Sequence, residues 1–272
     1  MIEILGFEFF RNALIAGILI SISCGIIGSF VVVRGIVFIS GGIAHSAFGG
    51  IGLSYLMGFN PLAGSLLFSI ASALGIGFLG KRGHQSEDTA IGAIWTLGMA
   101  AGIIFISMAP GYAPDLMSYL FGSILFVPTS YLYTLLVFDI IIAALVALFF
   151  NDFIAITFDE EYASIVKVPA EVLYYLLLML TALAVVMLIK VVGVILCIAM
   201  IAIPAAISLN FRDTMPGIII SSIVLGIIFI WTGMWLSYFT NTPSGAMIVI
   251  VAVSVYAIEV AVTNIKKRVG TG

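Results

Sequence analysis

Among the side chains in the apolar parts of this chain, the main candidates to bind a cation are His45, Asp115 and Asp139. Imidazole and carboxylate groups are common protein ligands of divalent transition metals. Asp139 lies near the middle of the apolar run 129–150, where a carboxylate is costly and normally faces a protein interior or a water-filled cavity. It could relay a proton or an ion, or be a hydrogen-bonded Asp between packed helices. Asp115 could be a ligand or a helix cap.

Small residues surround His45, which is one of only two histidines in the chain. On a helix, Gly41 and Gly49 lie on the same stripe as His45, four residues before and after it. The stripe beside it holds Gly42, Ser46 and Gly50. Such residues let a neighbouring helix approach closely, or leave space for an ion beside the imidazole. The spacing is compatible with both a pathway lining and helix packing.

The composition indicates an all-α, polytopic membrane protein. Hydrophobic residues make up 63% of the 272 residues and charged residues 8%, and the mean hydropathy is +1.30. A span needs about 20 apolar residues. Breaks in the pattern predict nine spans, at 9–33, 36–57, 61–80, 89–109, 129–150, 171–190, 191–209, 214–237 and 244–264. The shorter segment 112–127 is expected to be a re-entrant helix. The net charge of -3 leaves no basic stripe for nucleic acid.

The one sizeable polar connection, 151–170, is expected to form a cytoplasmic coupling segment within a single permease domain covering 1–272. Acidic residues favour the start of a helix, Lys167 lies near its end and Pro169 stops it. The acidic residues at this start are Asp159, Glu160 and Glu161. A solvated loop explains the composition equally well.

Basic residues near span ends predict the orientation, because cytoplasmic loops carry the excess of Lys and Arg. Nine crossings place most of them on the cytoplasmic side together with the C-terminus: Arg34, Lys81, Arg82, Lys167, Arg212, Lys266, Lys267 and Arg268. Arg11 and Lys190 fall outside.

The glycines of 75–80 match the pattern G-x-G-x-x-G, but they end an apolar span instead of following a strand. Helix packing explains them better than a nucleotide site does. We therefore expect a chain that is not an enzyme, with no permanently bound cofactor. Any ATP would be bound and hydrolysed in a partner subunit.

A series of short motifs runs in order along nearly the whole length of the chain. The pieces are Arg11-Asn12-Ala13-Leu14, Phe38-Ile39 with His45-Ser46-Ala47, Asn60-Pro61-Leu62, Ser86-Glu87-Asp88-Thr89-Ala90-Ile91-Gly92, Asp115-Leu116, Ser118-Tyr119-Leu120-Phe121-Gly122, Phe158-Asp159-Glu160-Glu161, Val168-Pro169, Val191-Val192-Gly193-Val194, Ile203-Pro204-Ala205-Ala206 and Pro243-Ser244-Gly245. This ordered set resembles the permease subunits of ABC-type importers for zinc, manganese and iron(II).

The resemblance implies a fold similar to that of the vitamin B12-type importer permease and a homodimeric pathway for a divalent metal ion. It also implies two cytoplasmic ATPase subunits docked on the segment 159–169, and an extracytoplasmic metal-binding protein that delivers the ion. ATP binding in the partners would move this segment, and rigid-body rearrangement of the spans would alternate access to the pathway.

One position departs from the family pattern. Many members carry an aspartate four residues before the pathway histidine, and here that residue is Gly41. Either the ion passes with weaker contacts, or Asp139 or Asp115 supplies the charge from another helix. A histidine with few carboxylates suits zinc slightly better than manganese, which prefers oxygen ligands.

Two other classes of protein are alternatives to a metal importer's permease. A secondary transporter would use Asp139 as its proton- or ion-coupling group and would work without an ATPase. An intramembrane enzyme would pair His45 with Asp139, but the sequence identifies no accompanying nucleophile or oxyanion donor.

Overall fold

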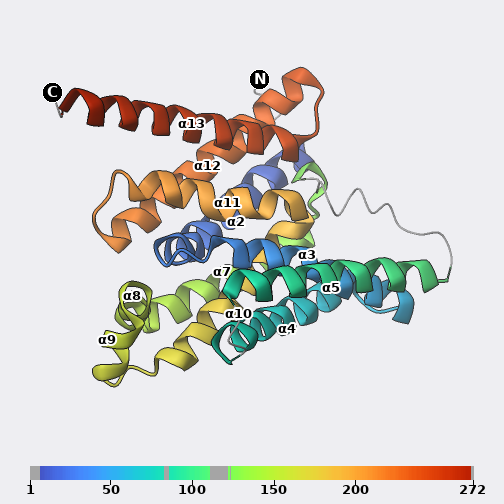
Figure 1. The fold of residues 1–272 in the computed structure, drawn as a ribbon. Helices are drawn as coiled ribbons and strands as arrows, with labels where there is room; N and C mark the ends of the chain where they lie inside the picture. Colours follow the sequence, from blue (N-terminus) through green and yellow to red (C-terminus); the bar gives the residue numbers. More distant parts are fainter. Residues whose placement is uncertain (1–6, 83–85, 111–121, 123, 271–272) are drawn as a thin grey trace.

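Helices make up the regular structure of the described part of the chain (Figure 1). The computed structural model describes residues 7–82, 86–110, 122 and 124–270. The long helices are α2 (Glu8–Val33), α3 (Val37–Met57), α4 (Pro61–Arg82), α5 (Glu87–Met108), α7 (Thr129–Leu148), α10 (Ala170–Val191), α12 (Met215–Thr240) and α13 (Ser244–Gly270). The shorter elements are η1 (Ile124–Phe126), α8 (Phe150–Phe158), α9 (Glu160–Ile165) and α11 (Val194–Leu209). The prediction of an all-α polytopic protein is confirmed.

Eight of the described helices are long and apolar enough to cross a membrane. The predicted span 191–209, the seventh of the nine, is wrong in length. Gly193, with φ of 91°, separates α10 from α11 in a conformation that glycine adopts readily. This leaves α11 with 16 residues, or about 24 Å at helical rise, against about 30 Å of hydrocarbon. Most of the predicted re-entrant helix lies outside the described residues, and its described end is the three-residue 3-10 turn η1.

The helices α2 and α10 form the centre of the bundle, and most of their side chains are buried. Around α2 pack α12, α11, α7 and α10, while α10 also contacts α4. A polar contact fixes the start of α7 against α2, because the Asn12 side-chain amide donates to the Val127 carbonyl at 3.3 Å and to the Thr129 hydroxyl at 3.0 Å.

The glycine-rich helix α3 is held between α4 and α5. A Cβ atom on Gly50 would lie 2.0 Å from the carbonyl oxygen of Gly64 in α4. On the other side, a Cβ atom on Gly98 of α5 would lie 2.4 Å from the Cα atom of Ser46. Backbones can approach this closely only where both helices present small residues.

One end of the bundle carries α8, α9, the α11–α12 connection and the C-terminal end of α13, at the left of Figure 1. The predicted coupling segment 151–170 contains two short helices, α8 and α9, where one helix or a loop was expected. The break between them falls at Asp159, which has an extended backbone (φ -154°, ψ 99°). We call this end of the bundle the coupling face.

Candidate functional site

His45 is half-buried on α3, and its imidazole stacks on the indole of Trp95 from α5. The ring centroids are 4.1 Å apart and the ring planes differ by 10°. The His45 Nδ1 atom is buried and has no hydrogen-bond partner among the described residues. The imidazole is therefore oriented by ring stacking and not by a hydrogen bond.

The small residues predicted to flank His45 are all buried in helix contacts: Gly41, Gly42, Ser46, Gly49 and Gly50. A Cβ atom on Gly42 would lie 2.7 Å from Ile91 of α5, and one on Gly49 would lie 2.7 Å from Phe68 of α4. The Ser46 hydroxyl donates to the Ile43 carbonyl of its own helix at 2.9 Å. In this structure the small side chains serve close packing of α3.

Gly41 stands where the resemblance leads one to expect an aspartate, and neighbouring helices fill the space beside it. A Cβ atom there would lie 2.5 Å from Ile198 Cδ1 of α11 and 3.8 Å from Trp95 Cζ3. A carboxylate at position 41 would require Ile198 to move. Ile198 thus occupies space that an aspartate side chain at position 41 would need, and the glycine at that position leaves this space to Ile198.

Asp139 is buried on α7 and pairs with α2 instead of with His45. The Ser23 hydroxyl donates to Asp139 Oδ1 and also lies 3.5 Å from Met187 Sδ of α10. The second oxygen, Oδ2, has no partner among the described residues. Ser23 thus connects α2 to Asp139 of α7 and to Met187 of α10, and a single neutral hydroxyl group is the partner of the Asp139 carboxyl among the described residues.

No group of three His, Cys, Asp or Glu side chains able to hold a metal ion occurs among the described residues. Asp115 lies outside those residues. The donors predicted from the sequence are thus not assembled into one metal centre within a single described chain.

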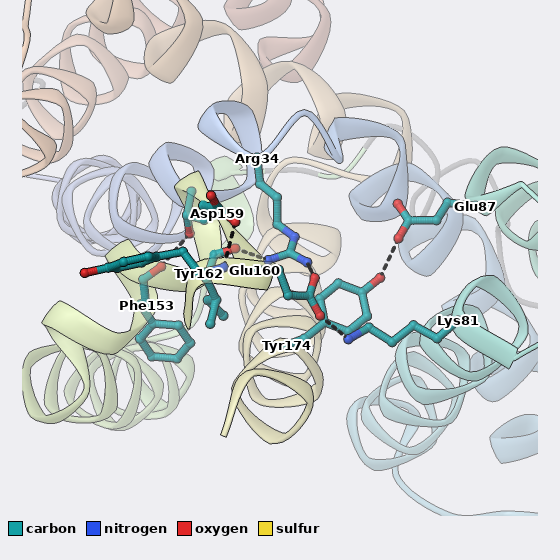
Figure 2. A network of polar contacts seen from close by, with 10 residues as sticks. Arg34, Lys81, Glu87, Phe153, Asp159, Glu160, Tyr162 and Tyr174 are labelled. Atoms are coloured by element: carbon teal, nitrogen blue, oxygen red, sulfur yellow. Dashed lines mark hydrogen bonds and ion pairs between the residues drawn. The ribbon is translucent and has the colours of Figure 1, made fainter. Parts of the chain in front are cut away.

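A second polar cluster lies on the coupling face, where Glu160 of α9 bridges two basic residues (Figure 2). Arg34, at the end of α2, and Lys81, near the end of α4, both donate to the Glu160 carboxylate. Arg34 also donates to the carbonyl oxygen of Ile156 in α8. These contacts confirm the prediction that Arg34, Lys81 and the segment 151–170 share one face.

Tyr174 of α10 extends this cluster into the bundle (Figure 2). The Arg34 guanidinium lies 4.7 Å from the centroid of the Tyr174 ring, and the Lys81 ammonium lies 4.5 Å from it. Both positions allow cation–π attraction. The Tyr174 hydroxyl donates to Glu87 of α5 at 3.0 Å. We call Arg34, Lys81, Glu87, Glu160 and Tyr174 the coupling cluster; it connects α9 to α2, α4, α5 and α10.

The charges of the coupling cluster keep Glu160 ionised. Burial on its own raises the pKa of the Glu160 carboxyl, but the hydrogen bonds and positive charges of Lys81 and Arg34 outweigh it, and the pKa is lowered from 4.5. The carboxylate is therefore negative at neutral pH and attracts both cations.

The other predicted coupling residues shape α9. Asp159 caps the helix, since its Oδ1 accepts from the Tyr162 amide at 2.9 Å. Lys167 takes a left-handed conformation (φ 64°) just past the end of α9, as a helix-ending residue does. Pro169 and Glu161 line a shallow hollow together with Glu171 of α10.

Sequence reasoning missed the apolar surface of α9 and the partners of Glu160. Phe158, Tyr162 and Ile165 are 68%, 58% and 73% exposed, although all three are large and apolar or aromatic. Tyr162 and Ile165 lie three residues apart and share one side of α9, while Phe158 is the last residue of α8, just before the break at Asp159. The three-residue spacing of Tyr162 and Ile165 was a usable signal. The pairing of Glu160 with Arg34 and Lys81 joins segments far apart in the sequence, for which no local signal exists.

Comparison with known proteins places these sites in context. The model of the ABC 3 transport family matches residues 6–263. The chain belongs to the ABC 3 transport family. Within it, an uncharacterized membrane protein of Synechocystis sp. is 44% identical over 261 residues, covering 96% of this chain and 93% of that protein. The manganese transport system membrane protein MntC of Listeria monocytogenes is 35% identical over 252 residues, covering 93% and 90%.

A solved structure has the same arrangement of helices. PsaBC from Streptococcus pneumoniae, determined in complex with Fab, contains a chain that superposes with a TM-score of 0.85 at 31% identity. The match covers 95% of this chain and 93% of that one. Together with the family match, it shows that the helices described above form the fold of an ABC transporter permease.

Proposed function

We propose that this chain is the permease subunit of an ABC importer that carries a divalent metal ion into the cytoplasm. The observation that carries the proposal is the coupling cluster, which links an exposed pair of short helices to four membrane helices. Such a connection between exposed short helices and membrane helices suits a transporter that is driven by a protein docked at one face. The family match and the metal named for the Listeria relative support the same function.

The docking surface for the ATPase is proposed to be the exposed apolar and aromatic side chains at the end of α8 and on α9. Phe158, Tyr162 and Ile165 would enter a groove of the partner, while Glu160 faces inward and holds α9 to the bundle. In this arrangement Glu160, at the acidic start of α9, would attach the helix to the bundle, and the exposed apolar side chains would form the docking contact. The coupling face, with the C-terminal end of α13, would then be cytoplasmic.

The permease is proposed to work as a homodimer with two ATPase subunits and an extracytoplasmic metal-binding protein. His45 would line the ion path, since its ring is half-buried in an otherwise closely packed helix. A single imidazole per chain binds weakly, which suits an ion that must also leave. Two copies of the chain would together offer two such groups.

The metal is proposed to be a first-row divalent ion. Manganese is the first to test because the Listeria relative carries that name, and zinc stays a prediction from the chemistry of His45. The full complex with its binding protein should show ATPase activity that its cognate metal stimulates. Comparing Mn²⁺, Fe²⁺ and Zn²⁺ at equal free concentration identifies the ion, and no stimulation by any of them would contradict metal import.

The alternative of a secondary transporter driven through Asp139 is not favoured. Membership of an ABC family and the pairing of Asp139 with Ser23 both weigh against it. Uptake that continued at full rate without ATP would restore this alternative.

A further inference from the structure

We propose that Trp95 is a positioning residue for His45, and that ring stacking does here what a hydrogen bond does at most histidine ligands. The inference rests on the proposed function, in which His45 lines the path of the metal ion. It goes beyond that function by naming the residue that sets the orientation of the imidazole.

The geometry of the two rings carries the proposal. A histidine ligand usually donates its second ring nitrogen to a carboxylate or a carbonyl, and this contact fixes the plane of the ring. The buried Nδ1 atom of His45 has no such partner among the described residues. The Trp95 indole instead covers one face of the imidazole at 4.1 Å and within 10° of parallel.

The surroundings of Gly41 show what packs beside the stacked rings. A side chain at position 41 would meet Ile198 first and would come within 3.8 Å of the Trp95 ring from its Cβ atom alone. The distance of 3.8 Å is an ordinary van der Waals contact, so the tight neighbour of position 41 is Ile198 and not the indole. Glycine at this position fits the close packing of α11 beside the stacked rings.

The consequence for transport is specific to binding. With Trp95 in place, the imidazole presents one edge to the path and needs no reorganisation when an ion arrives. Without it, the ring would rotate among several rotamers, and the ion would select one of them. The apparent affinity for the ion would fall, while the ATP-driven movement of the helices would be unchanged.

A spectroscopic experiment tests the stack without relying on transport. The permease chain alone is labelled with ¹³C-histidine, carries His84→Gln and is assembled with unlabelled partner subunits in lipid nanodiscs, so that His45 gives the only labelled histidine ring signal. We expect the His45 ring protons to be shifted upfield by the indole ring current, to lose that shift in Trp95→Leu, and to keep most of it in Trp95→Phe. Trp231→Leu, on α12, is the matched control and should leave the signal unchanged.

Transport kinetics separate positioning from mere packing. Changes to groups that orient a ligand typically weaken metal affinity about 10- to 100-fold. We expect the KM for Mn²⁺ to rise about tenfold in Trp95→Leu with kcat within about twofold of wild type, and Trp95→Phe to restore the KM at least in part.

An unchanged His45 signal and an unchanged KM in Trp95→Leu would overturn the inference even if the complex imports Mn²⁺. A fall in kcat alone, matched by Trp95→Phe, would overturn it as well, because it would assign Trp95 a structural role. If the wild-type complex moved no metal while the ring-current shift was present, the proposed function would fail and the stack would stand.

Discussion

Replacing Glu160 by glutamine should loosen α9 from the membrane helices while leaving the bundle folded. Glutamine keeps the shape of the side chain but removes the charge that attracts Arg34 and Lys81. Hydrogen bonds to charged groups contribute about 1.5–3 kcal/mol when shielded, and exposed ion pairs contribute about 0–1 kcal/mol. The Glu160 side chain is 36% exposed and that of Arg34 is 11% exposed, so each of the two contacts lies between these limits.

A combined loss of about 2 kcal/mol follows, since the neutral amide can still form one weaker hydrogen bond. At about 1.4 kcal/mol per factor of ten, this loss raises local opening of α9 roughly 30-fold. Hydrogen exchange of the α8 and α9 amides in lipid nanodiscs measures this opening directly. The amides in the middle of α10 should exchange as in the wild type, because global stability is little affected.

The matched control is Asp152→Asn on α8, which removes a negative charge from the coupling face but has no ion pair in the described structure. It should change α9 exchange by no more than about twofold to fivefold, as expected of a charge that acts only on a helix end. If Glu160→Gln behaved like this control, the coupling cluster would not be what holds α9.

Three further predictions follow from particular contacts. Lowering the pH should remove the stabilising effect of Glu160. Because the pKa of Glu160 is lowered in the folded chain, the stabilisation is complete above pH 4.5 and is lost as the pH falls through the folded pKa. Hydrogen exchange of α9 in the wild type and in Glu160→Gln should therefore converge in acid. Gly50→Ala should reduce assembly or lower the Tm, because its Cβ would lie 2.0 Å from a backbone oxygen and overpacking costs about 1–3 kcal/mol. Gly92→Ala, whose Cβ would have nothing within 4 Å, should be tolerated. Equal thermal stability of the two variants in detergent would refute this prediction. Asp139→Asn should keep Mn²⁺ uptake within about threefold of wild type, because the amide oxygen can still accept a hydrogen bond from Ser23. Asp139→Leu should lower the free energy of unfolding by about 1–3 kcal/mol. A much higher KM for Mn²⁺ in Asp139→Asn would make Asp139 a metal ligand.

The sequence predicted the features that depend on local chemistry. Ser86 caps α5, with its hydroxyl accepting from the Thr89 amide at 3.2 Å, and a Ser followed by the acidic residues Glu87 and Asp88 is a local signal for such a cap. The long apolar runs became membrane helices at close to the predicted bounds. The acidic start and the end near Lys167 correctly indicated a short helix in the coupling segment.

Features that depend on tertiary contacts were predicted less well. The length of α11 follows from a left-handed glycine at position 193, which composition alone does not reveal. The inward orientation of Glu160 depends on Arg34 and Lys81, which come from distant parts of the chain. The open choice between packing and ion space around His45 required the positions of Trp95, Ile198 and Gly64.

ATP-dependent uptake of Mn²⁺ into sealed vesicles containing the full complex tests the central claim most directly. We predict uptake that requires ATP on the side of α9, is several-fold slower in His45→Ala although the complex assembles normally, and moves less ion per ATP in Glu160→Gln. Uptake that proceeds equally without ATP, or that is unchanged in both variants, would contradict the account.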